Sequence, residues 1–259
     1  MVASDFWRPI LDAFDKGWNA YGISNDFPRK GWADLKFTDS PEEAVAYADQ
    51  GVPYKTSAAQ FKIVNAELQD ALERVYNAPR SVVLIGKQYA DGPEVEIAKT
   101  LSREVVRRFN VPVRVTNRRV VFDGVFAAAK KEGWLDKLHA VCYTGPLGLR
   151  PLTEDEKSIG ERLVMIQDPS VHQLASTSNA YAYMFLPGDI GTMNRLFEIL
   201  TLIQTGKLAR KPVLLVGRKF WQPIMDAIFK AMLERADGLK FISEQDSRNI
   251  KIVDEDNVE

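Results

Sequence analysis

The chain has 259 residues, of which 46% are hydrophobic, and it carries 34 basic and 35 acidic residues. This length and apolar content suffice to bury a full core. The balanced charge argues against a dedicated nucleic-acid binder, which usually carries a basic excess. No apolar stretch approaches the ~20 residues that span a bilayer, and the N-terminus lacks the pattern of a secretory signal. We therefore expect a cytoplasmic protein with no nucleic-acid or membrane partner.

The single cysteine and the two histidines limit the chemistry that is available. One cysteine excludes an internal disulfide, which fits a reducing compartment. Cys142 lies in the apolar run 140–143, so we predict a buried strand residue rather than a nucleophile. Widely spaced His and Cys residues do not make a zinc site. We expect no metal and no cofactor.

Residues 1–79 predict a helical extension. A capped amphipathic helix is expected over about 4–20. The stretch 22–37 is rich in Gly, Pro, Asn and Asp and predicts a loop. The sequence SPEE at 40–43 is a helix start, with a capping serine, Pro at the first helical position and Glu at the third. A longer amphipathic helix is expected over 57–76.

From residue 80 onward, apolar strands alternate with helices. Strands are predicted at 81–86, 111–116, 138–143, 163–166, 180–186 and 212–216, with helices at 93–109, 121–132, 191–204 and 221–234. This alternation predicts a parallel sheet covered on both faces, in which ligands bind at the carboxyl ends of the strands. We therefore predict a Rossmann-like, doubly wound α/β domain over 80–259.

One internal echo is present. Residues 6–16, FWRPILDAFDK, match residues 220–230, FWQPIMDAIFK, at seven of eleven positions. Two amphipathic helices with similar starts are the simpler interpretation, because the sequence shows no longer period. A true duplication is the alternative.

The most informative segment is LPGDIGTMNRLFE at 186–198. A predicted strand runs into the turn Pro187-Gly188, after which Gly191 and Thr192 open a helix. Glycines let the backbone approach a phosphate, and a helix N-terminus presents free N–H groups to it. The segment therefore predicts an anion site, with an ordinary strand-turn-helix connection as the alternative.

Residues 180–254 resemble the Lonely Guy (LOG) family, whose members carry a Pro-Gly-Gly-x-Gly-Thr-x-x-Glu turn before a similar helix, strand and Trp-x-Pro segment. A weaker resemblance covers 81–116, where Gly86 matches the glycine after the family's first strand. The resemblance implies a Rossmann-like fold, usually a homodimer, and hydrolysis of nucleoside 5′-monophosphates to free base and ribose 5-phosphate. Older descriptions of such proteins read "lysine decarboxylase", but the sequence has no sign of a pyridoxal phosphate lysine motif.

The sequence departs from the family at the residues that carry the chemistry. Asp189 replaces the second glycine of the turn, and a carboxylate there repels a phosphate unless a cation offsets it. Arg195 replaces the motif glutamate and has the wrong sign to stabilise a cationic ribose. Glu198 lies one helical turn further on and could face the same side.

Two further departures concern the ligand anchors. The family's Arg-Lys pair falls on His172 and Gln173; His172 is either a ligand contact or an exposed helix histidine. The family's second glycine-rich loop falls on 117–121, where Arg118 and Arg119 either bind a phosphate or form surface ion pairs. Lys87, directly after Gly86, is another candidate phosphate partner at a strand end.

Changes at the acid, the basic pair and both glycine turns together predict a catalytically degenerate LOG-like protein that binds a small phosphorylated ligand, such as a nucleoside monophosphate, and forms a homodimer. One alternative is an active hydrolase with a rearranged site; another is a structural or interaction protein. The candidate catalytic residues are Asp189, Arg195, Glu198 and His172, and the candidate ligand-binding residues are Gly86, Lys87, Arg118, Arg119, Pro187, Gly188, Gly191 and Thr192.

Overall fold

The computed structural model describes residues 4–20, 40, 42–43, 68–71, 73–86, 92–116, 120–144, 152–234 and 241–254. Its contacts divide the chain into two compact units. One unit comprises residues 1–56 and 218–248, and the other comprises 57–217 and 249–259. The predicted boundary between an extension and a LOG-like domain near residue 80 stays a prediction. Within the described ranges, no helix has both the length and the apolar character needed to cross a membrane.

The larger unit is built on a seven-stranded parallel sheet, as the alternating pattern predicts. The strand order is β4-β3-β2-β1-β5-β6-β7. The chain winds outward from β1 in one direction and then returns to β5 on the other side, so a topological switch point lies between β1 and β5. The strands are β1 (Ser81–Ile85), β2 (Val113–Thr116), β3 (Leu138–Tyr143), β4 (Leu163–Ile166), β5 (Ala180–Phe185), β6 (Val213–Val216) and β7 (Ile250–Val253).

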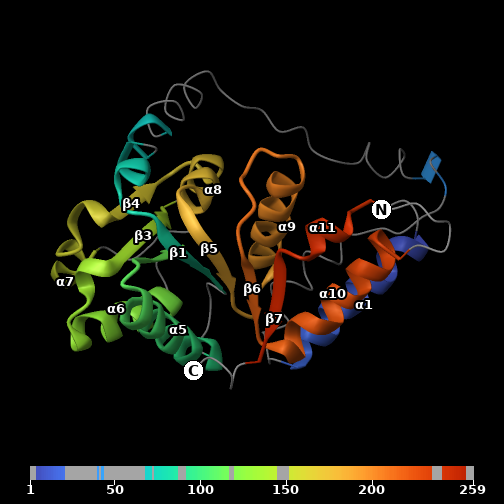
Figure 1. Cartoon of the computed structure of the whole chain (residues 1–259), viewed down its shortest axis with the longest axis horizontal. Helices are drawn as coiled ribbons and strands as arrows, with labels where there is room; N and C mark the ends of the chain where they lie inside the picture. Colours follow the sequence, from blue (N-terminus) through green and yellow to red (C-terminus); the bar gives the residue numbers. More distant parts are fainter. Residues whose placement is uncertain are drawn as a thin grey trace. The chain divides into compact units, whose positions relative to one another are not determined.

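Helices cover both faces of this sheet, which confirms the doubly wound α/β prediction. On one face α5 (Pro93–Phe109) and α6 (Val120–Glu132) pack on β2 and β3. On the other face α8 (Pro169–Thr177) packs on β3 and β4, and Figure 1 shows these helices on opposite sides of the strands. A hydrogen bond from α9 (Ile190–Gln204) to α8 places α9 on the α8 side.

Strand β3 shows how the two faces divide the core. Ala140 and Cys142 belong to the apolar cluster beneath α5 and α6, whereas Val141 belongs to the cluster beneath α8. Alternate side chains of a strand point to opposite faces, so a strand buried on both faces is apolar throughout. The side chain of Cys142 is fully buried, which confirms its prediction as a strand residue.

The sequence missed two elements that matter for the site. Helix α8 lies in a stretch that the predicted pattern leaves unassigned between two strands, and it carries His172. Strand β7 is short and only partly buried at the sheet edge, so its apolar signal is weak. Strand β2 begins at Val113 rather than at residue 111, because Pro112 has no N–H to donate to a sheet ladder.

The smaller unit brings the two echoed segments together. Helix α1 (Ser4–Ala20) packs along α10 (Arg218–Met232). In both helices the Phe-Trp pair adopts the same edge-to-face geometry: the ring centroids of Phe6 and Trp7 lie 4.9 Å apart at 87°, and those of Phe220 and Trp221 lie 4.9 Å apart at 85°.

The shared ring geometry is consistent with both interpretations of these segments, two similar helix starts and a true duplication.

The two helices approach each other closely at Gly17. A Cβ atom at this position would lie 3.2 Å from the Phe220 carbonyl oxygen and 3.3 Å from Ile224 Cδ1. We expect Gly17→Leu to lower the free energy of unfolding by about 1–3 kcal/mol, because overpacking forces the helices apart. Urea unfolding measures the effect, and Lys16→Leu on the exposed face of α1 is the control. Equal stability of the two variants would contradict this close approach.

Candidate functional site

A cavity of about 190 Å³ lies at the carboxyl ends of the strands, beside the topological switch point. Such edges are where open α/β sheets bind ligands, so the cavity lies where the sequence analysis expects a ligand site. The lining comes from the ends of β1, β2 and β3 and from the first turns of α8 and α9. The lining residues are Ile85, Gly86, Thr116, Tyr143, Pro169, His172, Gln173, Gly191, Thr192, Asn194 and Arg195.

The predicted anion turn begins α9, but the protein itself occupies part of it. Asp189 is the N-cap of α9, and its Oδ1 accepts a hydrogen bond from the Thr192 backbone N–H at 3.1 Å. The Thr192 hydroxyl lies 3.4 Å from the same oxygen. The N–H that a bound phosphate would use at a helix N-terminus is therefore already satisfied by a carboxylate.

The geometry explains one glycine of the turn. A Cβ atom at Gly188 would lie 2.1 Å from Thr192 Oγ1, so only glycine leaves room for the inward-facing threonine. Gly188 and Pro187 are buried behind the cavity rather than in its described lining. Of the predicted ligand-binding residues that the structure describes, Gly86, Gly191 and Thr192 line the cavity.

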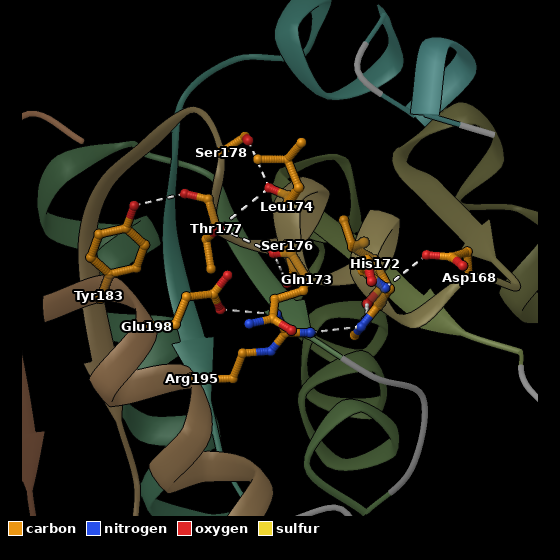
Figure 2. Close-up of polar contacts among 12 residues, drawn as sticks. Asp168, His172, Gln173, Leu174, Ser176, Thr177, Ser178, Tyr183, Arg195 and Glu198 are labelled. Atoms are coloured by element: carbon orange, nitrogen blue, oxygen red, sulfur yellow. Dashed lines mark hydrogen bonds and ion pairs between the residues drawn. The ribbon is translucent and has the colours of Figure 1, made fainter. Parts of the chain in front are cut away.

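Arg195 stands where the family carries its motif acid, and it joins α8 to α9. Its Nη2 lies 2.8 Å from His172 Nδ1, and its Nη1 donates to Glu198 Oε2 at 3.3 Å. The side chains of Arg195 and Glu198 are only 12% and 21% exposed. Figure 2 shows this row of side chains, with Arg195 between His172 and Glu198. The structure thus brings together three of the four candidate catalytic residues.

His172 is buried and held at both ring nitrogens, so its interpretation as an exposed helix histidine is wrong. Nε2 lies 3.1 Å from the Val141 carbonyl oxygen. A carbonyl can only accept, so Nε2 carries the proton, and Nδ1 accepts from Arg195. Burial and the Arg195 charge lower the pKa of His172 to about 3. The imidazole is therefore neutral at physiological pH.

The backbone of α8 fixes this histidine. The carboxylate of Asp168, the N-cap of α8, accepts hydrogen bonds from the N–H groups of Ser170 and Val171 at 2.8 and 3.0 Å. With Pro169 at the first helical position, this cap sets where the helix begins. His172 then lies one turn into α8 and faces β3, while Gln173 borders the cavity.

Burial also acts on Arg195. Desolvation lowers the pKa of its guanidinium, and the Glu198 carboxylate opposes that shift. An arginine starts from so high a pKa that it stays protonated. Arg195 therefore brings a positive charge to the cavity, and its ion pair with Glu198 offsets part of that charge.

Three predicted ligand-binding residues cannot be placed in the site, and three lining residues were not predicted. Lys87, Arg118 and Arg119 lie outside the described residues. Thr116, Tyr143 and Asn194 line the cavity and were not predicted. Thr116 and Tyr143 are the last residues of predicted strands. Because ligands bind at the carboxyl ends of parallel strands, this position marks them as candidate site residues. Within the described ranges, no group of three His, Cys, Asp or Glu side chains is placed to hold a metal ion.

Comparison with known families agrees with the sequence resemblance. Residues 144–258 match the family model described as "Possible lysine decarboxylase", the older description of LOG-like proteins. The matched segment contains α8, α9 and the turn between β5 and α9. No curated protein matches the chain.

The buried neutral His172 makes stability depend on pH. Its pKa is about 3 in the folded chain and about 6.5 in an unfolded one. Between these values the unfolded chain binds a proton that the folded chain does not, so the free energy of unfolding falls as pH falls. We expect His172→Gln to reduce this slope by up to about 1.4 kcal/mol per pH unit, as measured by urea unfolding at pH 7 and pH 5.

A second variant allows the protonation state of His172 to be measured directly. His139→Gln leaves His172 as the one histidine of the chain, so its imidazole can be titrated by NMR. A neutral Nε2–H tautomer down to pH 5 is the expected spectrum. Titration near the ordinary histidine value, about 6.5, would contradict the buried arrangement.

Proposed function

We propose that this chain, a LOG-like protein over residues 144–258, binds a nucleoside 5′-monophosphate at the carboxyl edge of its sheet without hydrolysing the N-glycosidic bond. One observation carries the proposal: Arg195 replaces the motif acid and is fixed between His172 and Glu198. The scaffold of the family is present, and the charge at its catalytic position is reversed.

The reversed charge acts against the family reaction. Glycosidic cleavage builds positive charge on the ribose, which the family's glutamate stabilises. A fixed cation near that ribose raises the barrier instead, since two like charges 4 Å apart repel by about 4 kcal/mol at the effective dielectric near a protein surface. A binding protein keeps the phosphate contacts of the fold and has no need of the acid.

The remaining carboxylates do not favour a rearranged hydrolase. Asp189 accepts hydrogen bonds from Thr192 as the cap of α9. Glu198 forms an ion pair with Arg195. Each carboxylate is engaged with its own helix, so neither is poised as a general base or as the partner of a cationic ribose.

Several features favour a phosphate ligand at the same edge. The cavity is lined by Gly86, Gly191 and Thr192 and by the cationic side chain of Arg195. A phosphate at the N-terminus of α9 gains the helix dipole and displaces Asp189 from the Thr192 N–H. Asp189 thus acts as an internal competitor that sets a moderate affinity. The homodimer implied by the resemblance stays a prediction.

Ligand and reaction can be tested together. Purified protein is screened by thermal shift against AMP, GMP, CMP, UMP and ribose 5-phosphate, and each mixture is chromatographed for released base. We expect at least one nucleoside monophosphate to raise the melting temperature with no base released. Release of base at rates typical of enzymes would overturn the proposal. Absence of any shift would favour an interaction protein instead.

The role of Asp189 gives a more specific test. Asp189→Gly removes the internal competitor and its charge, and glycine at an N-cap lowers stability by only a few tenths of a kcal/mol. We expect nucleoside monophosphates to bind about tenfold more tightly, since a carboxylate near a phosphate opposes binding by roughly 1 kcal/mol or more. Calorimetry measures the affinity. Thr153→Gly, which removes the cap of α7 (Glu154–Lys157), is the control, and equal affinities in both variants would refute this role.

A further inference from the structure

A second cavity, of about 850 Å³, opens at the amino ends of β2, β3 and β4, at the opposite edge of the sheet from the candidate site. Its sheet wall includes Arg114, His139 and Val164, each the second residue of its strand. Its volume is in the range of small-molecule sites, about 300–1,000 Å³. The two cavities share no described lining residue.

Basic groups form the floor of this cavity. Arg114 and His139 are neighbours in the register of β2 and β3, and they are only 1% and 4% exposed. Burial, together with repulsion by the charges of Arg114 and Arg162, lowers the pKa of His139 to about 4. Both arginines therefore act on the same imidazole, and the three groups form one basic cluster.

The donors of this cluster are incompletely used. Arg114 Nη1 donates to the Ser178 carbonyl oxygen, the C-cap of α8, at 2.5 Å. Arg114 Nη2 and Arg162 Nε are buried and have no hydrogen-bond partner among the described residues. Capping of α8 explains the position of Arg114 Nη1, but it does not explain Arg114 Nη2 or Arg162 Nε. Buried donors without partners are rare in folded proteins and call for an explanation.

The acidic residues of the cavity lie at its rim rather than on its floor. Asp70, Glu73, Asp136 and Glu161 all line the cavity and are all solvent-exposed. Asp70 is already within 3.8 Å of Arg74 Nη1. Within the described part of the chain, neither Arg114 nor Arg162 forms an ion pair. Burial alone lowers the pKa of Arg114 to about 10, because an unpaired buried charge is unfavourable.

We propose that this cavity binds a small molecule through an oxyanion group, a phosphate or a carboxylate, held by the guanidinium groups of Arg114 and Arg162, which both line the cavity. Planar guanidinium groups suit such oxygens. The volume beyond the anion accommodates the rest of the molecule against polar side chains such as Asn77 and Lys137. The proposal is independent of nucleotide binding at α9.

Calorimetry with inorganic phosphate tests the site on the full chain. Arg114→Met and Arg162→Met are each expected to weaken phosphate binding by about tenfold or more, because a charge-assisted hydrogen bond is lost. Arg107→Met is the matched control, since Arg107 is an exposed arginine that pairs with Glu104 on α5. In Arg195→Met, at the candidate site, the response of the His139 imidazole signals to phosphate is expected to be unchanged.

NMR of the unaltered protein gives a second measurement that no folding defect can obscure. The chain has two histidines: His139 lies on the floor of this cavity, and His172 lies at the candidate site. Phosphate is expected to shift the imidazole signals of His139 and to raise its pKa above about 4.

The proposal is overturned if phosphate does not bind, if it perturbs His172 alone, or if it binds both arginine variants as it binds the natural chain. AMP binding that is lost in Arg195→Met, with no response at His139, would separate a failure here from a failure of the proposed nucleotide site.

Discussion

The candidate site depends on one buried guanidinium. Arg195 holds His172 on α8 and Glu198 on α9 in a single row, and His172 in turn donates to the Val141 carbonyl of β3. Two helices and the sheet are thereby linked through hydrogen bonds that are largely shielded from water, where such bonds are stronger than at the surface. A glutamate at position 195 would leave His172 Nδ1 without its donor and would repel Glu198.

Two of the departures from the family pattern, Arg195 and His172, therefore form one interacting set with Glu198. Arg195 at the acid position needs an acceptor and an anion, and His172 and Glu198 provide them. His172 in place of a family arginine is neutral, because its pKa is far below the physiological range. Because these side chains contact one another, substitutions at positions 172, 195 and 198 are not energetically independent.

The two edges of the sheet differ in whether the chain itself supplies partners for the buried cationic groups. At the carboxyl edge the chain supplies both the cation and the anions, so Arg195 is paired and Asp189 occupies a helix N-terminus. At the amino edge Arg114 and Arg162 keep buried donors that nothing in the described chain satisfies. Helix α8 borders both regions: its first turns hold His172, and its last carbonyl accepts from Arg114.

Local patterns in the sequence determined most of the fold. Short apolar runs placed six of the seven strands, and Cys142 was assigned to the core because strands buried on both faces are apolar throughout. The turn at 186–198 located the start of α9 at the carboxyl edge of the sheet. These features were predictable because hydrophobic periodicity and turn chemistry act over a few neighbouring residues.

Tertiary structure alone decided the partners of the polar side chains. The sequence placed Arg195 and Glu198 one turn apart, but 23 residues separate Arg195 from His172, and 31 separate His172 from its acceptor at Val141. Arg114 sits in a predicted central strand, where nothing local marks it as the floor of a cavity. Parallel strands and helices meet through long connections, so which charges become neighbours, and which are buried, is fixed only when the sheet assembles.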